Sequence, residues 1–271
     1  MSEQENSTPE GMLSKMMAVA AVATAFVSPA AADPAVLSFS QEWSTDLTGY
    51  IFLPVSTTGT STVAGSSGSI DLSLRDALEL LDFAASIRSE SWKGDFGLIF
   101  DANYLSLGQD FVGGGGGSAQ VDVEQYWLAF MGAYRVAGSN GAGDRPYSFD
   151  IHAGARYNSL KQQLDLNGPG PGMSFGGTET WWEPVIGARY TWQINDRWTG
   201  AVLADAGGFG VNGSDLQFST TLGFDYGYDN GGSLKLGVRY YSIDYSNVRS
   251  DGLFAYDVDQ VGPFVGYTFR F

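Results

Sequence analysis

The sequence contains no cysteine, a single histidine and few basic residues. Without cysteine there can be no disulfide, no thiolate metal site and no lipid-modified N-terminal cysteine. Lys and Arg number 14 against 30 Asp and Glu, which gives a formal net charge of -16. Proteins that bind nucleic acid need a basic face, so this balance argues against that class of partner.

Long apolar runs are also missing after Asp33, so no transmembrane helix is predicted there. Charged residues make up only 16% of the chain, against about 25% in an ordinary soluble domain. Glycine (37 residues) and aromatic residues (14%) are abundant. This composition favours many extended strands joined by tight turns, and it does not fit disorder, which lacks aromatic residues.

The N-terminus has the features of a secretory signal. Lys15 precedes a short apolar run, Met16–Val27, and Ala30–Ala32 supply a cleavage site before Asp33. We therefore predict a signal peptide over residues 1–32 and a mature domain over residues 33–271. The first eleven residues are acidic, so we expect translation to start at Met12. An uncleaved membrane anchor is disfavoured because the run is shorter than the roughly 20 residues that span a bilayer.

Ten segments of the mature chain alternate with a period of two, which is the pattern of β-strands. They cover Gln41–Leu53, Asp82–Trp92, Phe96–Gly108, Gln120–Ala137, Tyr147–Gln163, Thr178–Gln193, Arg197–Ala206, Leu216–Tyr228, Ser233–Tyr245 and Tyr256–Phe271. A tilted transmembrane strand needs about 9–11 residues, and single-chain bacterial barrels have an even number of strands. The fold class predicted is all-β, an antiparallel up-and-down transmembrane β-barrel of about ten strands, with eight to twelve as the range.

The connections alternate in length. The second, sixth and eighth are tight polar turns (KGD, NDR and DNGG), and the fourth is of moderate length. The odd-numbered connections are longer: Pro54–Leu81, Gln109–Ala119, Leu164–Gly177, Gly207–Asp215 and Ser246–Ala255. Outer-membrane barrels place short turns in the periplasm and long loops outside, so we expect both termini on the periplasmic side.

The first long connection carries one short amphipathic helix in the prediction. Leu74, Ala77, Leu78 and Leu81 share one helical face, and Ser73 with Asp76 forms a capping box. The helix is expected either to cap the barrel mouth, to rest on the membrane interface or to pack on the barrel rim.

The terminal segment GPFVGYTFRF has two different faces. Tyr267, Phe269 and Phe271 point to one side of a strand and Arg270 to the other. Periodicity alone does not say which face is inside, and a lipocalin-like barrel would bury the apolar one. The export signal, the sorting of loops and the terminal aromatic residue favour an apolar face toward lipid.

A short sequence repeat follows the same alternation of lipid-facing and lumen-facing residues. GARY occurs at Gly154–Tyr157 and Gly187–Tyr190, and GVRY at Gly237–Tyr240. Glycine and arginine then share the lumen face, and we expect the glycine to make room for the long arginine side chain.

With the apolar faces outward, the strands direct equal numbers of acids and bases into the lumen. The bases are Arg88, Arg135, Arg156, Arg189, Lys235, Arg239 and Arg270, and the acids are Asp46, Glu90, Asp101, Asp150, Glu183, Asp205 and Asp225. Charges removed from water must pair, so we predict ion pairs across the lumen. Barrels of about eight strands are filled by side chains, whereas sixteen or more leave a channel. The balance therefore favours a closed or constricted lumen.

Catalysis is not predicted. His152 lies only a few residues into its strand, and we expect it beside Asp150 and Arg156 in a structural role. Gly113–Gly117 is not a phosphate-binding loop, because a strand and not a helix follows it. We predict no enzymatic activity, no catalytic, cofactor or metal site, and no cofactor.

Several stretches resemble an uncharacterised family of small outer-membrane β-barrel proteins of Gram-negative bacteria. These are WSTDLTGYIFLPV, LRDALELLDFA, RSESWKGDFGLIFDANYLSL, DAGGFGV and the terminal GPFVGYTFRF. The chain is also loosely similar to opacity-protein, OmpA-like and OmpW-like barrels. The resemblance implies an outer-membrane location, contact with outer-membrane lipid and lipopolysaccharide, and insertion by the barrel-assembly machinery, which would recognise Tyr267, Phe269 and Phe271.

The expected function is a structural or surface-interaction role with a mostly closed lumen. The alternative is a small porin-like pore for ions or small solutes.

Overall fold

The computed structural model of the chain describes residues 39–112, 117–140, 145–168 and 171–271. The predicted signal peptide and the start at Met12 lie outside the described residues and stay predictions. Within the described ranges, no helix is both long enough and apolar enough to cross a membrane.

The described chain is almost entirely β-structure. The elements are β1 (Ser44–Phe52), β2 (Ser56–Val63), β3 (Ser66–Ser73), α2 (Leu74–Leu80), β4 (Leu81–Lys93), β5 (Phe96–Val112), β6 (Ser118–Ser139), β7 (Tyr147–Asn167), β8 (Met173–Gln193), β9 (Trp198–Val211), β10 (Ser214–Gly227), β11 (Ser233–Arg249) and β12 (Gly252–Arg270). Every segment predicted as a strand forms one, and several strands run further than expected.

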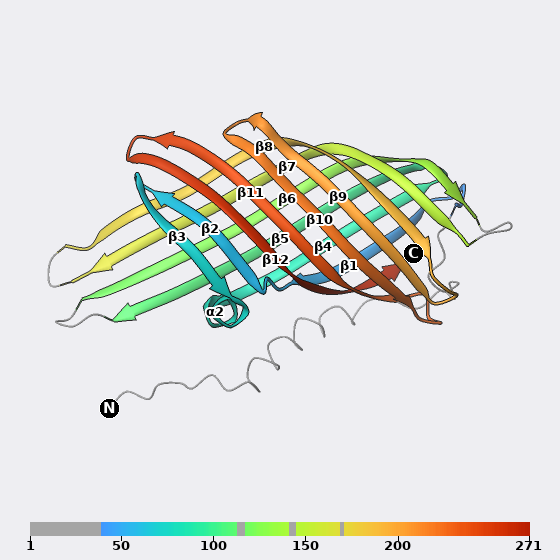
Figure 1. Cartoon of the computed structure of the whole chain (residues 1–271), viewed down its shortest axis with the longest axis horizontal. Helices are drawn as coiled ribbons and strands as arrows, with labels where there is room; N and C mark the ends of the chain where they lie inside the picture. The colour runs from blue at the N-terminus through green and yellow to red at the C-terminus, as the bar shows by residue number, and fades with distance from the viewer. Residues whose placement is uncertain (1–38, 113–116, 141–144, 169–170) are drawn as a thin grey trace, which may run out of the picture.

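Among these elements, β1 and β4–β12 close into an antiparallel ring of ten strands (Figure 1). The ring closes where β1 pairs with β12, from Asp46 opposite Arg270 to Phe52 opposite Phe264. Thr45 and Phe271 extend this seam through two backbone hydrogen bonds of 3.0 and 2.9 Å. The predicted barrel of about ten strands is confirmed.

The long outer connections prove to be mostly strand. β6 and β7 are 22 and 21 residues long, and only Asn212 and Gly213 separate β9 from β10. These two residues have φ angles of 53° and 82°, as a tight Asn-Gly hairpin turn requires. The expectation of long outer loops was therefore wrong for the last four outer connections, whereas the first, between β1 and β4, is long. The Asn-Gly pair was the sequence signal for the correct hairpin.

The first long connection contains a hairpin that the sequence pattern did not show. After Pro54, β2 continues along β12, from Ser56 opposite Val261 to Thr62 opposite Ala255. β3 then returns beside β2. This hairpin was missed because its Ser, Thr and Gly residues give no hydrophobic alternation, although threonine is a good strand former.

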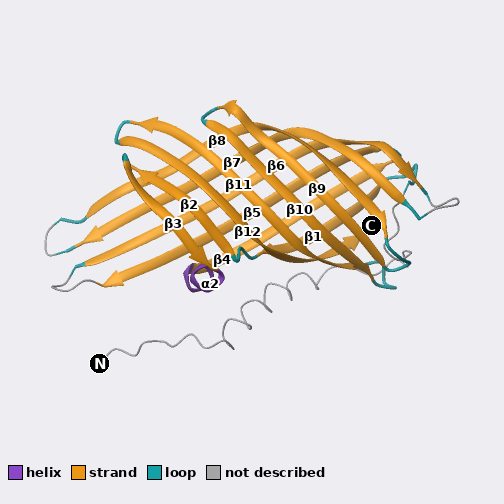
Figure 2. Ribbon diagram, viewed as in Figure 1, coloured by secondary structure: helices purple, strands orange, loops and turns teal. Residues whose placement is uncertain are grey.

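The predicted helix is present as α2, with the capping box formed by Ser73 and Asp76. The hydrogen bonds from Ser73 lower the pKa of the Asp76 carboxyl. The helix lies on the flank of the barrel, where β3 and β4 separate (Figure 2), and it contacts β3 and β5. The helix therefore packs against the barrel wall and does not cap its mouth, and no residue of α2 is buried. Whether it also rests on the membrane interface stays a prediction.

The outer surface of the ring carries a belt of exposed apolar side chains. Leu98, Ile151, Ile186 and Val238 are 60%, 45%, 55% and 52% exposed on four different strands. A soluble barrel would expose such residues to water at a high cost, whereas lipid solvates them. The apolar face therefore points outward, and the lipocalin-like alternative is wrong.

Two rows of touching aromatic rings border this belt. The row near the termini contains the pairs Phe96–Tyr134, Tyr147–Tyr190, Trp198–Tyr226 and Tyr228–Tyr267. The other row contains Phe83–Tyr104, Tyr126–Tyr157, Tyr157–Trp182 and Phe218–Tyr240. We call them the inner and outer girdles, because aromatic girdles mark the two membrane interfaces of such barrels.

The spacing of the girdles fits a bilayer. On β7 they lie at Tyr147 and Tyr157, and a tilted strand segment of that length rises about 25 Å. Beyond the outer girdle the exterior becomes polar, as the partly exposed pair Lys161–Glu124 at 2.7 Å shows. The closed ring, its belt and its girdles make this chain a transmembrane β-barrel of the outer-membrane type.

The glycines of the GARY and GVRY repeats serve close strand approach. A Cβ atom at Gly154 would lie 1.9 Å from the carbonyl oxygen of Phe130, and one at Gly237 would lie 2.3 Å from that of Leu222. At these two positions the neighbouring backbone sets the need for glycine. The sequence analysis expected glycine to make room for the arginine side chain, and that explanation of these two glycines was wrong.

We predict that Gly154→Ala destabilises the barrel by about 1–3 kcal/mol, because the backbone of β6 must move. The matched control is Gly132→Ala, since no atom lies within 4 Å of a Cβ there and Gly132 lies on β6, the strand that pairs with β7. The measurement is urea unfolding in lipid vesicles, followed by tryptophan fluorescence. Equal unfolding midpoints for both variants would contradict this account.

Candidate functional site

The outer half of the lumen is filled by an apolar core. We call this the outer core. It consists of Leu160, Trp181, Tyr241, Ile243, Tyr245, Phe254, Tyr256 and Val258. Trp181 on β8 stacks on Tyr245 on β11, with ring centroids 3.8 Å apart and planes 17° apart. These strands are separated in the ring by β9 and β10, so the contact joins two parts of the wall that are not paired with each other.

A buried charged group, the upper network, lies beneath the outer core. The Arg156 guanidinium contacts Glu183 at 3.3 Å and Asp205 at 2.5 Å. Glu183 also accepts hydrogen bonds from Ser214 Oγ at 2.6 Å and Trp181 Nε1 at 3.3 Å. The network therefore fixes the ring of Trp181 and ties the outer core to three strands of the wall.

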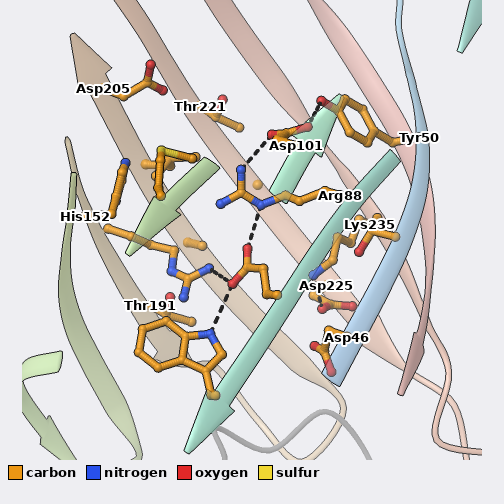
Figure 3. Close-up of a pocket in the computed structure, with 18 of the residues that line it drawn as sticks. Asp46, Tyr50, Arg88, Asp101, His152, Thr191, Asp205, Thr221, Asp225 and Lys235 are labelled. Carbon is orange, nitrogen blue, oxygen red and sulfur yellow. Dashed lines mark hydrogen bonds and ion pairs between the residues drawn. The ribbon is translucent and has the colours of Figure 1, made fainter. Parts of the chain in front are cut away.

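A larger group lies closer to the inner end. This middle network contains Arg88, Glu90, Asp101, Arg135, Asp150 and Arg189. The Glu90 carboxylate forms ion pairs of 2.6 Å with both Arg88 and Arg189. Because Arg88 is on β4 and Arg189 is on β8, Glu90 links two walls of the barrel. Figure 3 shows Arg88 reaching toward Asp101, which also accepts a hydrogen bond from Tyr50 at 2.9 Å.

The third group, the rim cluster, closes the seam at the inner end. Arg270 contacts Asp46 at 3.4 Å and Asp225 at 3.3 Å, and Lys235 contacts Asp225 at 2.7 Å. The last strand is thereby joined electrostatically to the first strand and to the β10–β11 pair.

Arg239 is the remaining predicted lumen base, and its surroundings differ. Its Nε donates to Ser219 Oγ at 3.1 Å. Its guanidinium carbon lies 5.9, 5.6 and 5.4 Å from the ring centroids of Phe52, Trp127 and Tyr241. Within the part of the chain that the structure describes, no carboxylate forms an ion pair with it. The sequence did not distinguish Arg239 from the other lumen arginines.

His152 is buried in the lumen wall, against Gly187 on the adjacent strand. Among the described residues, no hydrogen bond joins it to Asp150 or Arg156, whose charges are engaged in the middle and upper networks. His152 and Asp205 both line the cavity drawn in Figure 3. No group of three metal-ligating side chains occurs in the described ranges.

The inner half of the lumen holds a cavity of about 630 Å³, which we call the inner cavity. It extends from Ser44 and Phe271 at the rim to Trp127 and Arg239 beneath the outer core. Its space arises because β9 and β10 contribute small side chains, among them Ala201 and Gly223, while the opposite wall carries long arginines.

One wall of the inner cavity is apolar, which period-two reasoning did not predict. The β6 segment YWLAFMGAY carries apolar residues on both faces, and Trp127, Ala129 and Met131 line the cavity. This double-sided apolar run was the signal that the lumen is not polar throughout.

Comparisons with known proteins found no matching family model and no matching curated protein. Several solved structures share the general shape. The attachment invasion locus protein Ail of Yersinia pestis is 11% identical, with 84% of this chain and 98% of that chain covered and a TM-score of 0.36.

The translocator domain of the autotransporter NalP from Neisseria meningitidis is 15% identical, covers 97% of each chain and has a TM-score of 0.39. OprG from Pseudomonas aeruginosa is 9% identical, with coverages of 86% and 97% and a TM-score of 0.37. The outer-membrane barrel is established by the closed ring, belt and girdles of this chain itself.

We predict that Arg156→Gln destabilises the barrel by roughly 3–5 kcal/mol, since Glu183 and Asp205 would stay buried with no cationic partner. The control is Lys161→Gln on the same strand, whose partly exposed pair with Glu124 contributes less than about 1 kcal/mol. Guanidinium unfolding of both variants measures the difference. A loss of the same size in both would show that burial of the upper network does not matter.

Proposed function

We propose that the protein is an integral outer-membrane barrel that acts as a structural or surface-interaction element and not as an open channel. The stack of Trp181 on Tyr245 across the lumen carries this proposal. Side chains of strands that are not neighbours meet there, and the surrounding residues of the outer core are buried. This packing supports a lumen whose outer half is closed to solutes.

The surface role is supported by the strands that extend beyond the outer girdle. The β5–β8 strands project furthest at the outer end in Figure 1, and their exterior there carries charged side chains such as Asp122, Glu124 and Lys161. A polar, anionic sheet at this height lies among the lipopolysaccharide headgroups. We propose lipopolysaccharide and outer-membrane lipid as its immediate partners.

The inner cavity favours one alternative, a small pore for ions or small solutes. The cavity already opens the inner half of the lumen. Conduction would require the outer core to part, because it separates the cavity from the outer end. The two functions thus differ in whether the outer core stays closed.

We predict that the purified wild-type barrel gives no stable current steps in a planar bilayer. Truncating both stacked rings, as Trp181→Ala with Tyr245→Ala, should produce steps because a cavity replaces the contact between the walls. Trp182→Ala is the matched control, since this neighbouring tryptophan is 52% exposed on the lipid face and its loss should leave the barrel silent.

Reproducible conductance from the folded wild-type protein would reject the closed barrel and support the pore. Folding is checked independently by heat-modifiable migration in a gel. Ion selectivity of any current would then report the charge of the conducting path.

We also propose that the barrel-assembly machinery inserts this chain and recognises Tyr267, Phe269 and Phe271. We predict that deleting Phe271 lowers the amount of barrel in the outer membrane. Phe271→Ala separates the two possible causes, because it keeps the backbone hydrogen bonds to Thr45 and removes only the ring. Membrane levels equal to wild type in both variants would contradict this role.

A further inference from the structure

Arg239 differs from the other lumen cations in the hydrogen-bond donors of its guanidinium group. Every other predicted lumen base has a carboxylate within 4.0 Å, and among the described residues none lies that close to Arg239. Aromatic faces stabilise a guanidinium without occupying its N–H groups. Within the described ranges, the hydrogen bond of the Arg239 side chain is the one from Nε to Ser219, so its terminal amino groups can donate into the inner cavity that Arg239 lines.

The wall below Arg239 is apolar. Thr221 on β10 pairs with Arg239, and the next row toward the inner end is formed by Ala201, Gly223, Gly237 and Phe264. None of the four residues of this next row carries a polar side chain. A molecule whose charged end reaches Arg239 would therefore lay its body on an apolar surface.

The opposite wall and the size of the cavity agree with such a molecule. Trp127, Ala129 and Met131 face the same space. A volume of about 630 Å³ falls within the range of about 300–1,000 Å³ found for small-molecule sites. The cavity also has charged residues in its lining, but most of these are engaged in the ion pairs of the three groups described above. Apolar surface next to a few oriented polar groups is typical of ligand pockets.

The charge of the ligand follows from Arg239 itself. Among the described residues, it is the predicted lumen base that no carboxylate reaches within ion-pair distance, so an anionic ligand can take that position. Asp101 and Asp205 line the same cavity and would repel a ligand that carries several negative charges, so a single negative charge suits the site.

We propose that the inner cavity binds a small amphipathic monocarboxylate from the periplasmic side, with the carboxylate on the Arg239 guanidinium and the apolar body against β9, β10 and Phe264. This site goes beyond the structural role proposed above and does not require the lumen to conduct.

Binding is tested with hexanoate and benzoate as probes on the full barrel, extracted from outer membranes in detergent. Acetate lacks the apolar body, and benzyl alcohol lacks the charge. Isothermal titration calorimetry against matched empty micelles gives the affinity. Tryptophan fluorescence gives a second readout, because Trp92 and Trp127 line the cavity.

We expect saturable binding of at least one probe, and binding of acetate and benzyl alcohol at least about tenfold weaker. Arg239→Gln should weaken the probe by about tenfold or more, and Ala201→Leu should weaken it by filling the cavity while leaving the cation in place. Arg249→Gln is the control, because Arg249 lies on the same strand at the outer end, beside Glu179 and Asp251.

Three results would overturn the proposal: no saturable binding of either probe, acetate binding as tightly as benzoate, or unchanged affinity in folded Arg239→Gln. If Arg239→Gln does not fold, Arg239→Lys and Ala201→Leu decide instead, with unchanged affinity in both as the contrary result. The conductance of the same sample is measured in a planar bilayer. Because ligand binding does not require conduction, the two measurements test this proposal and the closed barrel separately.

Discussion

Closure of the ring between β1 and β12 is the constraint on which the rest of the structure depends. In lipid, every backbone amide and carbonyl must find a partner within the protein, so an open sheet edge is not tolerated. The seam from Asp46–Arg270 to Phe52–Phe264 removes that edge. Thr45 and Phe271 extend it by one further residue pair. With ten strands in the closed ring, the lumen is narrow enough for side chains of opposite walls to meet.

That narrow lumen explains both halves of the interior. Where the wall residues are large and apolar, as at Trp181 and Tyr245, they stack across the barrel and exclude water. Where the walls carry charges, each carboxylate is close enough to reach an arginine or lysine. Small residues on β9 and β10 leave one region unfilled, and that region is the inner cavity. The same ring thus produces a core, three ion-pair groups and a cavity at successive heights.

The division of the barrel into two halves follows from its two solvents. Between the girdles the exterior is apolar and the interior holds charges, as in other barrels that span a membrane. Beyond the outer girdle the exterior meets water and headgroups, so apolar residues such as Ile243 and Phe254 turn inward. The upper network lies below this core and holds its tryptophan in place. The outer half therefore resembles a small soluble sandwich built on a membrane barrel.

The sequence by itself determined the strands of the membrane-spanning region and the direction of their faces. Alternation with a period of two assigns each side chain to lipid or lumen, so the acids and bases of the three ion-pair groups could be named without coordinates. The pair of Arg249 with Glu179 near the outer end was not among them. The helix was also readable, because Ser73 and Asp76 form a local capping box. These features depend on contacts between residues that are close in the chain.

Only the tertiary structure decided what depends on residues far apart in the chain. Alternation with a period of two does not predict that Trp181 contacts Tyr245. Nor does it predict that Arg239 lies among aromatic rings whereas Arg88 forms ion pairs with carboxylates. The β2–β3 hairpin was hidden for a related reason, since its polar residues show no alternation and it is held by pairing with β12. Closure of the ring sets which walls face each other, and this in turn sets which charges pair and where space remains.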